Sequence, residues 1–147
     1  MTTSSRTHTR SYDVIVYGAT GFTGRLVAEH LAARTAAGAD IRWAMAGRNP
    51  DKLAQVAAEI GVADIPLVIA DASDPDSLAW MAAATQVVCS TVGPYAVYGE
   101  PTVAACVEAG TDYVDLTGEP QFVRAMIDRY HDAAVASGAR IVHSCGF

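Results

Sequence analysis

Short apolar runs alternate along this chain with longer stretches in which the apolar residues recur at helical spacing. Brief continuous runs of this kind are typical of strands that are buried on both faces of a sheet. The predicted strands occupy residues 13–17, 41–46, 65–70, 86–92, 112–116 and 141–144. The predicted helices occupy residues 22–34, 51–60, 73–84, 101–108 and 122–136.

Strands that alternate with helices in this way predict parallel βαβ units with right-handed crossovers. We therefore expect an α/β fold of the Rossmann type, with six strands in a doubly wound parallel sheet of order 3-2-1-4-5-6. In such a sheet, ligands bind at the carboxyl ends of the strands, near the switch point between strands 1 and 4. The loops after the strands are thus the place to look for a site.

The 147 residues are enough for one domain with a substantial core. Residues 1–11 are rich in threonine, serine and arginine and lack the apolar segment of a signal peptide, so we interpret them as a disordered tail before a dinucleotide-binding domain at 12–147. Residues 77–99 carry no charge, but Thr85-Gln86 and Gly93-Pro94 interrupt them. We expect two elements of a water-soluble fold there and no transmembrane segment.

A glycine-rich turn follows the first predicted strand. Gly18, Gly21 and Gly24 have the spacing G-x-x-G-x-x-G, which departs from the usual G-x-G-x-x-G, and a predicted helix begins at Phe22. In this arrangement backbone N–H groups and the helix dipole point at an anion, and missing Cβ atoms let it approach. We expect the turn to bind the phosphates of a dinucleotide, closest at Gly21; the alternative is a tight turn without a ligand.

Charge and cysteine content indicate which kinds of partner and which cellular compartment to expect. The net charge is −6 with no basic block, which argues against a nucleic-acid partner. Cys89, Cys106 and Cys145 lack a C-x-x-C spacing, and an odd number of cysteines cannot all pair within the chain. Reduced thiols in a cytoplasmic protein are the simpler interpretation.

The loop after the second strand indicates which dinucleotide is bound. NAD sites place a carboxylate there to bind the ribose hydroxyls, whereas this chain has Arg48, whose guanidinium can bind a 2′-phosphate; the alternative is a solvated surface arginine. Asp71, after the third strand, could either hold the adenine amino group or cap a turn. Thr91, Val92 and Gly93 leave the fourth strand where the nicotinamide ribose would lie, although Gly93-Pro94 could be a simple chain reversal.

Catalytic residues are much harder to predict. No G-x-S-x-G motif, metal-ligand cluster or nucleophile–base pair is present, and Tyr98 has no lysine four residues later. We interpret His143, on the last predicted strand, as a packed and hydrogen-bonded core residue rather than an acid or base. Cys145 could equally be a small core residue. We therefore assign no catalytic residue and no metal ligand.

Five segments together resemble the saccharopine dehydrogenase-like oxidoreductases, and among them the actinobacterial trans-acting enoyl reductases of polyketide-derived lipid synthesis. They are V-Y-G-A-T-G-F-T-G (16–24), A-G-R-N (46–49), S-T-V-G-P-Y (90–95), A-C-V-E-A-G-T-D-Y-V-D-L-T-G-E (105–119) and H-S-C-G-F (143–147). The resemblance implies an oxidoreductase that uses NADP(H) on a small-molecule or acyl-chain substrate.

The resemblance also assigns binding roles to individual residues. It implies that the pyrophosphate loop consists of Gly18, Thr20, Gly21, Phe22, Thr23 and Gly24. It implies that Arg48 contacts the 2′-phosphate and that Val92, Gly93 and Pro94 form the wall beside the nicotinamide.

Members of this family continue beyond the C-G-F segment into a second domain that shapes the substrate pocket. We therefore expect that the full-length parent is an NADPH-dependent reductase, that this chain alone is inactive, and that an apolar surface facing the second domain favours homodimers. The main alternative is a non-catalytic nucleotide-sensing module of the same fold, because fold does not settle function. An isomerase or synthase that holds the nucleotide without net oxidation is another alternative.

Overall fold

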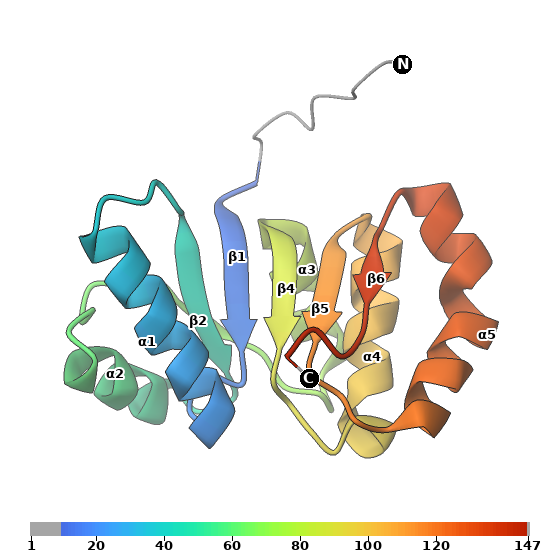
Figure 1. Ribbon diagram of the computed structural model, residues 1–147, viewed down its shortest axis with the longest axis horizontal. Helices are drawn as coiled ribbons and strands as arrows, with labels where there is room; N and C mark the ends of the chain where they lie inside the picture. Colours follow the sequence, from blue (N-terminus) through green and yellow to red (C-terminus); the bar gives the residue numbers. More distant parts are fainter. Residues whose placement is uncertain (1–9, 147) are drawn as a thin grey trace.

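The computed structural model describes residues 10–146 and contains a six-stranded parallel sheet of order β3-β2-β1-β4-β5-β6 (Figure 1). This confirms the predicted fold class and strand order. The elements along the chain are β1 (Tyr12–Tyr17), α1 (Phe22–Ala36), β2 (Trp43–Gly47), α2 (Pro50–Glu59), β3 (Leu67–Ile69), α3 (Pro75–Ala84), β4 (Thr85–Ser90), α4 (Tyr95–Ala109), β5 (Asp112–Asp115), α5 (Pro120–Ser137) and β6 (Ile141–Val142).

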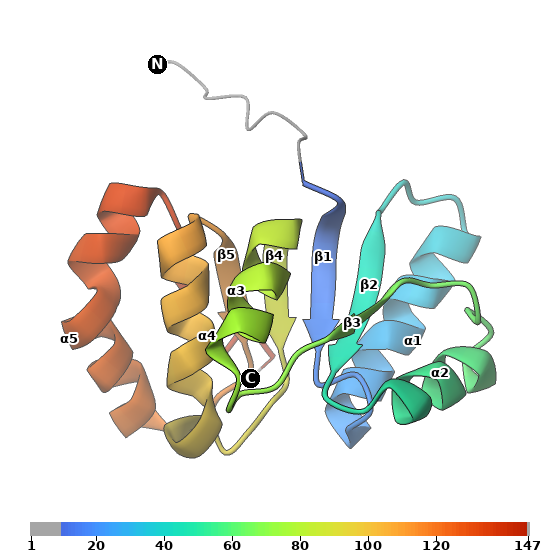
Figure 2. The same cartoon turned by 180° about the vertical axis from the view of Figure 1, so that it is seen from behind.

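Helices cover both faces of the sheet. Helices α1 and α2 lie over one face, and α3, α4 and α5 lie over the other, as the two opposite views show (Figures 1 and 2). Alternate side chains of β1 divide between the two layers, since Val16 packs into the cluster that includes α1 and α2, while Ile15 and Tyr17 pack into the larger cluster on the other side. All three are almost completely buried. Because both faces of the sheet are buried, the strand sequences are continuously apolar and do not alternate between apolar and polar residues.

Helix α4 begins at Tyr95, six residues before the expected start at Pro101, which lies inside the helix. The cause is a side chain from another part of the chain. The Glu119 carboxylate accepts hydrogen bonds from the backbone N–H groups of Tyr95 at 2.7 Å and Ala96 at 3.1 Å. These bonds cap the start of α4 and favour helix there despite the internal proline.

Two strands end two residues earlier than predicted. Strand β4 stops at Ser90 rather than Val92, and β6 stops at Val142 rather than Ser144. At the end of β6, Ser144 has a positive φ of 61°, and its N–H donates to the Asp115 carboxylate at 2.9 Å. The chain therefore turns out of the sheet to reach a buried side chain on β5.

The predicted N-terminal tail lies outside the described residues except for Arg10 and Ser11. The Arg10 guanidinium donates to the carbonyl oxygens of Ala82 at 3.1 Å, Thr85 at 2.6 Å and Ala109 at 2.6 Å, and also to the Thr111 hydroxyl. Ala82 and Ala109 lie in the last turns of α3 and α4, where carbonyl groups lack helical partners. Arg10 thus joins the ends of two helices and the start of β4.

Among the helices between residues 10 and 146, none is both long enough and apolar enough to cross a membrane.

Candidate functional site

A cavity of about 620 Å³ lies at the carboxyl edge of the sheet. Its walls are the segments that follow β1, β2, β3 and β4, together with the first turn of α4. The lining residues are Tyr17, Gly18, Thr20, Gly21, Gly47, Arg48, Ala70, Asp71, Ala72, Ser73, Thr91, Val92, Gly93, Val97 and Tyr98. Both its volume and its place at the switch point between β1 and β4 are typical of a ligand site in a doubly wound sheet.

The three glycines of the turn are needed for three different reasons. Gly18 has a φ of +91°, a conformation that L-residues with side chains rarely adopt. At Gly24 a Cβ atom would lie 2.6 Å from the carbonyl carbon of Gly18 and 2.8 Å from the Thr91 hydroxyl oxygen, so the start of α1 packs directly on the turn. At Gly21 the nearest atom to such a Cβ would be the Gly18 carbonyl oxygen at 3.4 Å. Gly21 therefore has space on its open side, and that side belongs to the cavity.

The N-terminus of α1 has no side-chain cap. No acidic residue lies in its first turn, and Gly21 is at its N-cap position. By contrast, backbone N–H groups at the starts of α2, α3 and α4 donate hydrogen bonds to the side chains of Asn49, Asp74 and Glu119. The first N–H groups of a helix lack intrahelical partners, so those of α1 are available to an anion.

Only part of the predicted pyrophosphate loop lines the cavity, because its last three residues belong to the start of α1. The Phe22 side chain is 85% exposed, and neither Phe22, Thr23 nor Gly24 lines the cavity. Of the predicted pyrophosphate loop, Gly18, Thr20 and Gly21 are brought to the cavity wall. Phe22, Thr23 and Gly24 stand at the helix start, where their backbone N–H groups rather than their side chains face the loop.

Arg48 and Asp71 approach the cavity from the ends of β2 and β3. Arg48 is exposed, and within residues 10–146 no salt bridge or hydrogen bond engages its guanidinium. Asp71 accepts bonds at Oδ1 from the N–H of Ser73 at 2.9 Å and from its hydroxyl at 2.8 Å. These bonds hold the pKa of Asp71 below its ordinary value. Asp71 therefore caps a turn, as one of our two interpretations proposed, and its contact with adenine stays a prediction.

The segment after β4 forms the opposite wall. The Thr91 hydroxyl donates to the carbonyl oxygens of Tyr17 at 3.0 Å and Gly18 at 3.3 Å, so this side chain fastens the glycine turn to β4. Val92 and Gly93 line the cavity, whereas Pro94 occupies the N-cap position of α4 and does not. The Gly93–Pro94 peptide bond is cis.

Two lining residues, Tyr17 and Tyr98, were missed from the sequence, whereas Val97 lies at the end of the loop after β4 where a site was expected. Tyr98 lies in the first turn of α4, and placing the helix start at Pro101 concealed it. Tyr17 is the last residue of β1 and reads as a core position, since it is only 3% exposed. Its place directly before Gly18 was the one signal that could have indicated it.

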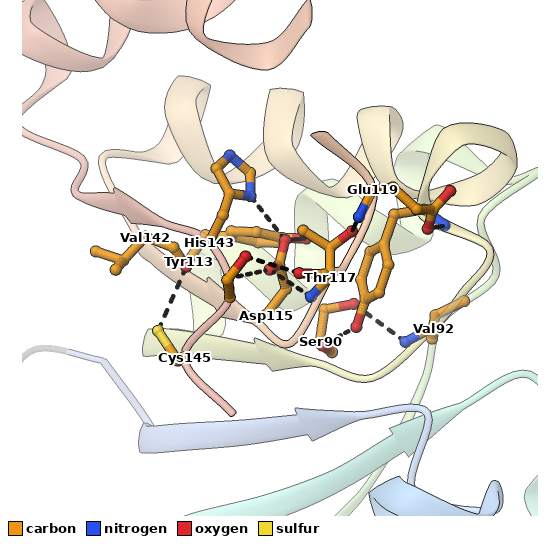
Figure 3. Close-up of polar contacts among 11 residues, drawn as sticks. Ser90, Val92, Tyr113, Asp115, Thr117, Glu119, Val142, His143 and Cys145 are labelled. Carbon is orange, nitrogen blue, oxygen red and sulfur yellow. Dashed lines mark hydrogen bonds and ion pairs between the residues drawn. The ribbon is translucent and has the colours of Figure 1, made fainter. Parts of the chain in front are cut away.

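A second group of polar side chains surrounds Asp115 at the end of β5 (Figure 3). The Asp115 carboxylate accepts hydrogen bonds from His143 Nδ1 at 2.8 Å, the Tyr113 hydroxyl at 2.9 Å, and the N–H groups of Thr117 at 3.0 Å and Ser144 at 2.9 Å. Burial alone would raise the pKa of Asp115, but these hydrogen bonds outweigh it and lower the pKa below its ordinary value. The network connects β5, β6 and the turn before α5.

This network does not reach the cavity, because none of its members lines it. The His143 side chain is 9% exposed and lies edge-on to Phe122 at 5.4 Å between ring centroids. The interpretation of His143 as a packed, hydrogen-bonded residue is confirmed. The alternative that Cys145 is a small core residue is wrong, because Cys145 is exposed beyond the end of β6.

The family model of the saccharopine dehydrogenase NADP-binding domain matches residues 14–142. The chain belongs to this family. The match includes the glycine turn, the loop that contains Arg48 and every strand of the sheet, and it confirms the resemblance derived from the sequence motifs. NADP is accordingly the dinucleotide for which this domain family is named.

Curated relatives of this NADP-binding domain include the trans-acting enoyl reductases of Mycobacterium tuberculosis, 54% identical over 94% of the chain, and of Mycobacterium ulcerans, 52% identical over 94%. The chain spans about a third of the length of these relatives, 33% in each case.

Solved structures share the fold at lower identity. Saccharopine dehydrogenase from Saccharomyces cerevisiae matches with a TM-score of 0.71 at 21% identity, covering 92% of this chain and 27% of that one. Triphenylmethane reductase from Citrobacter sp., solved in complex with NADP(H), matches with a TM-score of 0.64 at 20% identity, covering 89% of this chain and 48% of that one.

Proposed function

We propose that this domain binds NADPH in the cavity at the carboxyl edge of the sheet and supplies the cofactor-binding part of a reductase that acts on an enoyl-type acyl substrate in lipid or polyketide synthesis. The observation that carries the binding proposal is the uncapped start of α1, which opens beside a 620 Å³ cavity at Gly21. The enoyl substrate is inferred from the mycobacterial relatives.

The residues of the cavity fit NADPH in one orientation. The glycine turn and the start of α1 offer backbone N–H groups to the pyrophosphate. Arg48, free of other partners in the described part of the chain, offers a guanidinium to the 2′-phosphate. Asp71 lies on the adenine side, and Thr91, Val92, Gly93 and Pro94 follow β4 on the nicotinamide side.

Bound NADPH would supply a hydride to the acceptor carbon. The residues of this domain bind and orient the nucleotide, and two carboxylates outside the cavity are already engaged: Glu119 caps α4, and Asp115 accepts four hydrogen bonds. Hydride transfer needs the acceptor held about 3 to 3.5 Å from the nicotinamide with water excluded. We propose that the parts of the longer relatives beyond the matched third hold the substrate. The three cysteines are free thiols, which supports a cytoplasmic protein.

Titration of the chain with NADPH, followed by calorimetry, tests the binding proposal, and failure to bind NADPH would refute it. A protein that extends this chain to the full length of its relatives should then oxidise NADPH in the presence of an enoyl thioester, whereas the 147-residue chain should not. Binding without consumption of NADPH by the full-length protein would instead favour a nucleotide sensor.

A further inference from the structure

Tyr17 is a buried tyrosine whose hydroxyl has no hydrogen-bond partner within residues 10–146. Its side chain is 3% exposed, and it lines the cavity at the end of β1. The other two tyrosines of the core behave differently. The Tyr95 hydroxyl donates to the Ser90 carbonyl oxygen at 2.9 Å, and the Tyr113 hydroxyl donates to the Asp115 carboxylate at 2.9 Å. Among the described residues, Thr102 Oγ1 is the side-chain oxygen that is fully buried without a partner, whereas the Tyr17 hydroxyl has no protein partner and belongs to a residue that lines the cavity. It is therefore available to a ligand there.

Two charged side chains line the cavity together with Tyr17: Arg48, which follows β2, and Asp71, which follows β3. Burial and the Asp71 carboxylate together raise the pKa of Tyr17 to about 12, against the lowering effect of the Arg48 guanidinium. At neutral pH the hydroxyl keeps its proton and can donate a hydrogen bond.

We propose that the Tyr17 hydroxyl donates a hydrogen bond to the adenosine half of the bound nucleotide, between the groups held by Arg48 and Asp71. The inference rests on the proposed function, since Arg48 and Asp71 mark the adenosine side only if NADPH lies in the cavity as described. The ribose and its 2′-phosphate carry oxygen acceptors, and such an acceptor can take the hydrogen bond that the Tyr17 hydroxyl does not make within the described residues. Tyr17 thereby becomes a nucleotide-binding residue as well as a core residue.

The test removes only the hydroxyl, with the Tyr17→Phe substitution, and measures binding of NADPH and of 2′,5′-ADP, which carries the adenosine half alone. Loss of one neutral hydrogen bond should weaken the binding of both ligands by the same factor, about two- to tenfold. The melting temperature without ligand should not fall, because no internal bond is lost. Tyr113→Phe is the matched control, since it removes a hydroxyl bonded to Asp115; it should lower the melting temperature and leave 2′,5′-ADP binding unchanged.

Each other result overturns the proposal. Unchanged affinity of Tyr17→Phe for both ligands would show that the hydroxyl does not contact the nucleotide. A melting temperature lowered as much as in Tyr113→Phe would show that the hydroxyl has a structural role. Weaker binding of NADPH alone would place the contact on the nicotinamide half. If the unmodified chain bound neither ligand, the proposed function would fail first and this contact with it.

Discussion

The same chemical change at Gly21 and at Gly24 should have opposite effects, although only three residues separate them. At Gly21 the backbone has φ −79° and ψ 169°, an extended conformation that alanine adopts readily, and the nearest atom to an added Cβ is 3.4 Å away. Gly21→Ala should therefore leave the fold intact and stabilise it by about 0.4–1 kcal/mol through the unfolded state. Its methyl group would occupy the cavity side, where we place the phosphates.

The binding cost at Gly21 follows from the contacts that the methyl group would displace. Moving the pyrophosphate away from one backbone N–H removes a charge-assisted hydrogen bond of about 1.5–3 kcal/mol, or roughly a ten- to hundredfold loss of NADPH affinity. Gly21→Val adds a larger branched side chain and should abolish binding with the fold retained.

At Gly24 the balance is reversed. An added Cβ would overlap the Gly18 carbonyl oxygen, which is its nearest neighbour at 2.0 Å, and would lie 2.6 Å from the Gly18 carbonyl carbon, where an ordinary contact is about 3.5 Å. Overpacking of this kind costs about 3 kcal/mol, and the better helix propensity of alanine recovers only about 1 kcal/mol. The net loss of about 2 kcal/mol should lower the melting temperature by roughly 4–8 °C.

Differential scanning calorimetry and NADPH titration of both variants separate the two effects. Full NADPH affinity in a folded Gly21→Ala protein would refute the placement of the phosphates on this loop. A Gly24→Ala protein as stable as the unmodified chain would refute the close packing of α1 on the turn.

Two further changes test other parts of the structure. Arg48→Glu should reverse or abolish the preference for NADPH over NADH by placing a carboxylate against the 2′-phosphate, and equal affinities of the unmodified chain for both nucleotides in calorimetry would remove Arg48 from the site. Because the folded-state pKa of Asp115 is lowered, its stabilising contribution is present above its unfolded pKa near 3.8 and is lost as the pH falls through the lower folded value. Urea unfolding between about pH 2 and 6 should show this loss, and Asp115→Asn should remove that part of the pH dependence; an identical pH profile in the variant would contradict it.

The sequence was sufficient for the order of the sheet because alternation and crossover handedness are repeated along the whole chain. The sequence-based prediction was wrong at the ends of helices and strands that a side chain distant in the sequence determines. The start of α4 depends on Glu119, which lies at the N-cap of α5, and the end of β6 depends on Asp115. Neither contact leaves a local signal near the residues whose conformation it determines.

The candidate site divides in the same way. Gly18, Gly21 and Arg48 were placed correctly on the cavity wall, because loops that follow neighbouring parallel strands must meet at one edge. Phe22 belonged to the same motif, yet its side chain is exposed and does not line the cavity. Tyr17 could not be distinguished from its apolar neighbours in β1, since only the three-dimensional structure shows that its hydroxyl lacks a partner.

Because the Arg10 guanidinium is hydrogen-bonded at the amino ends of the strands, its accessibility to a protease reports local opening of that edge of the sheet. Trypsin cleaves after an arginine only when the guanidinium enters its acidic specificity pocket. In the folded chain that guanidinium is occupied by three carbonyl oxygens and the Thr111 hydroxyl, so the Arg10–Ser11 bond should be resistant. The rate of tryptic cleavage at this bond would then measure how often the ends of α3 and α4 separate from the first strand, while the nucleotide cavity at the other edge remains formed.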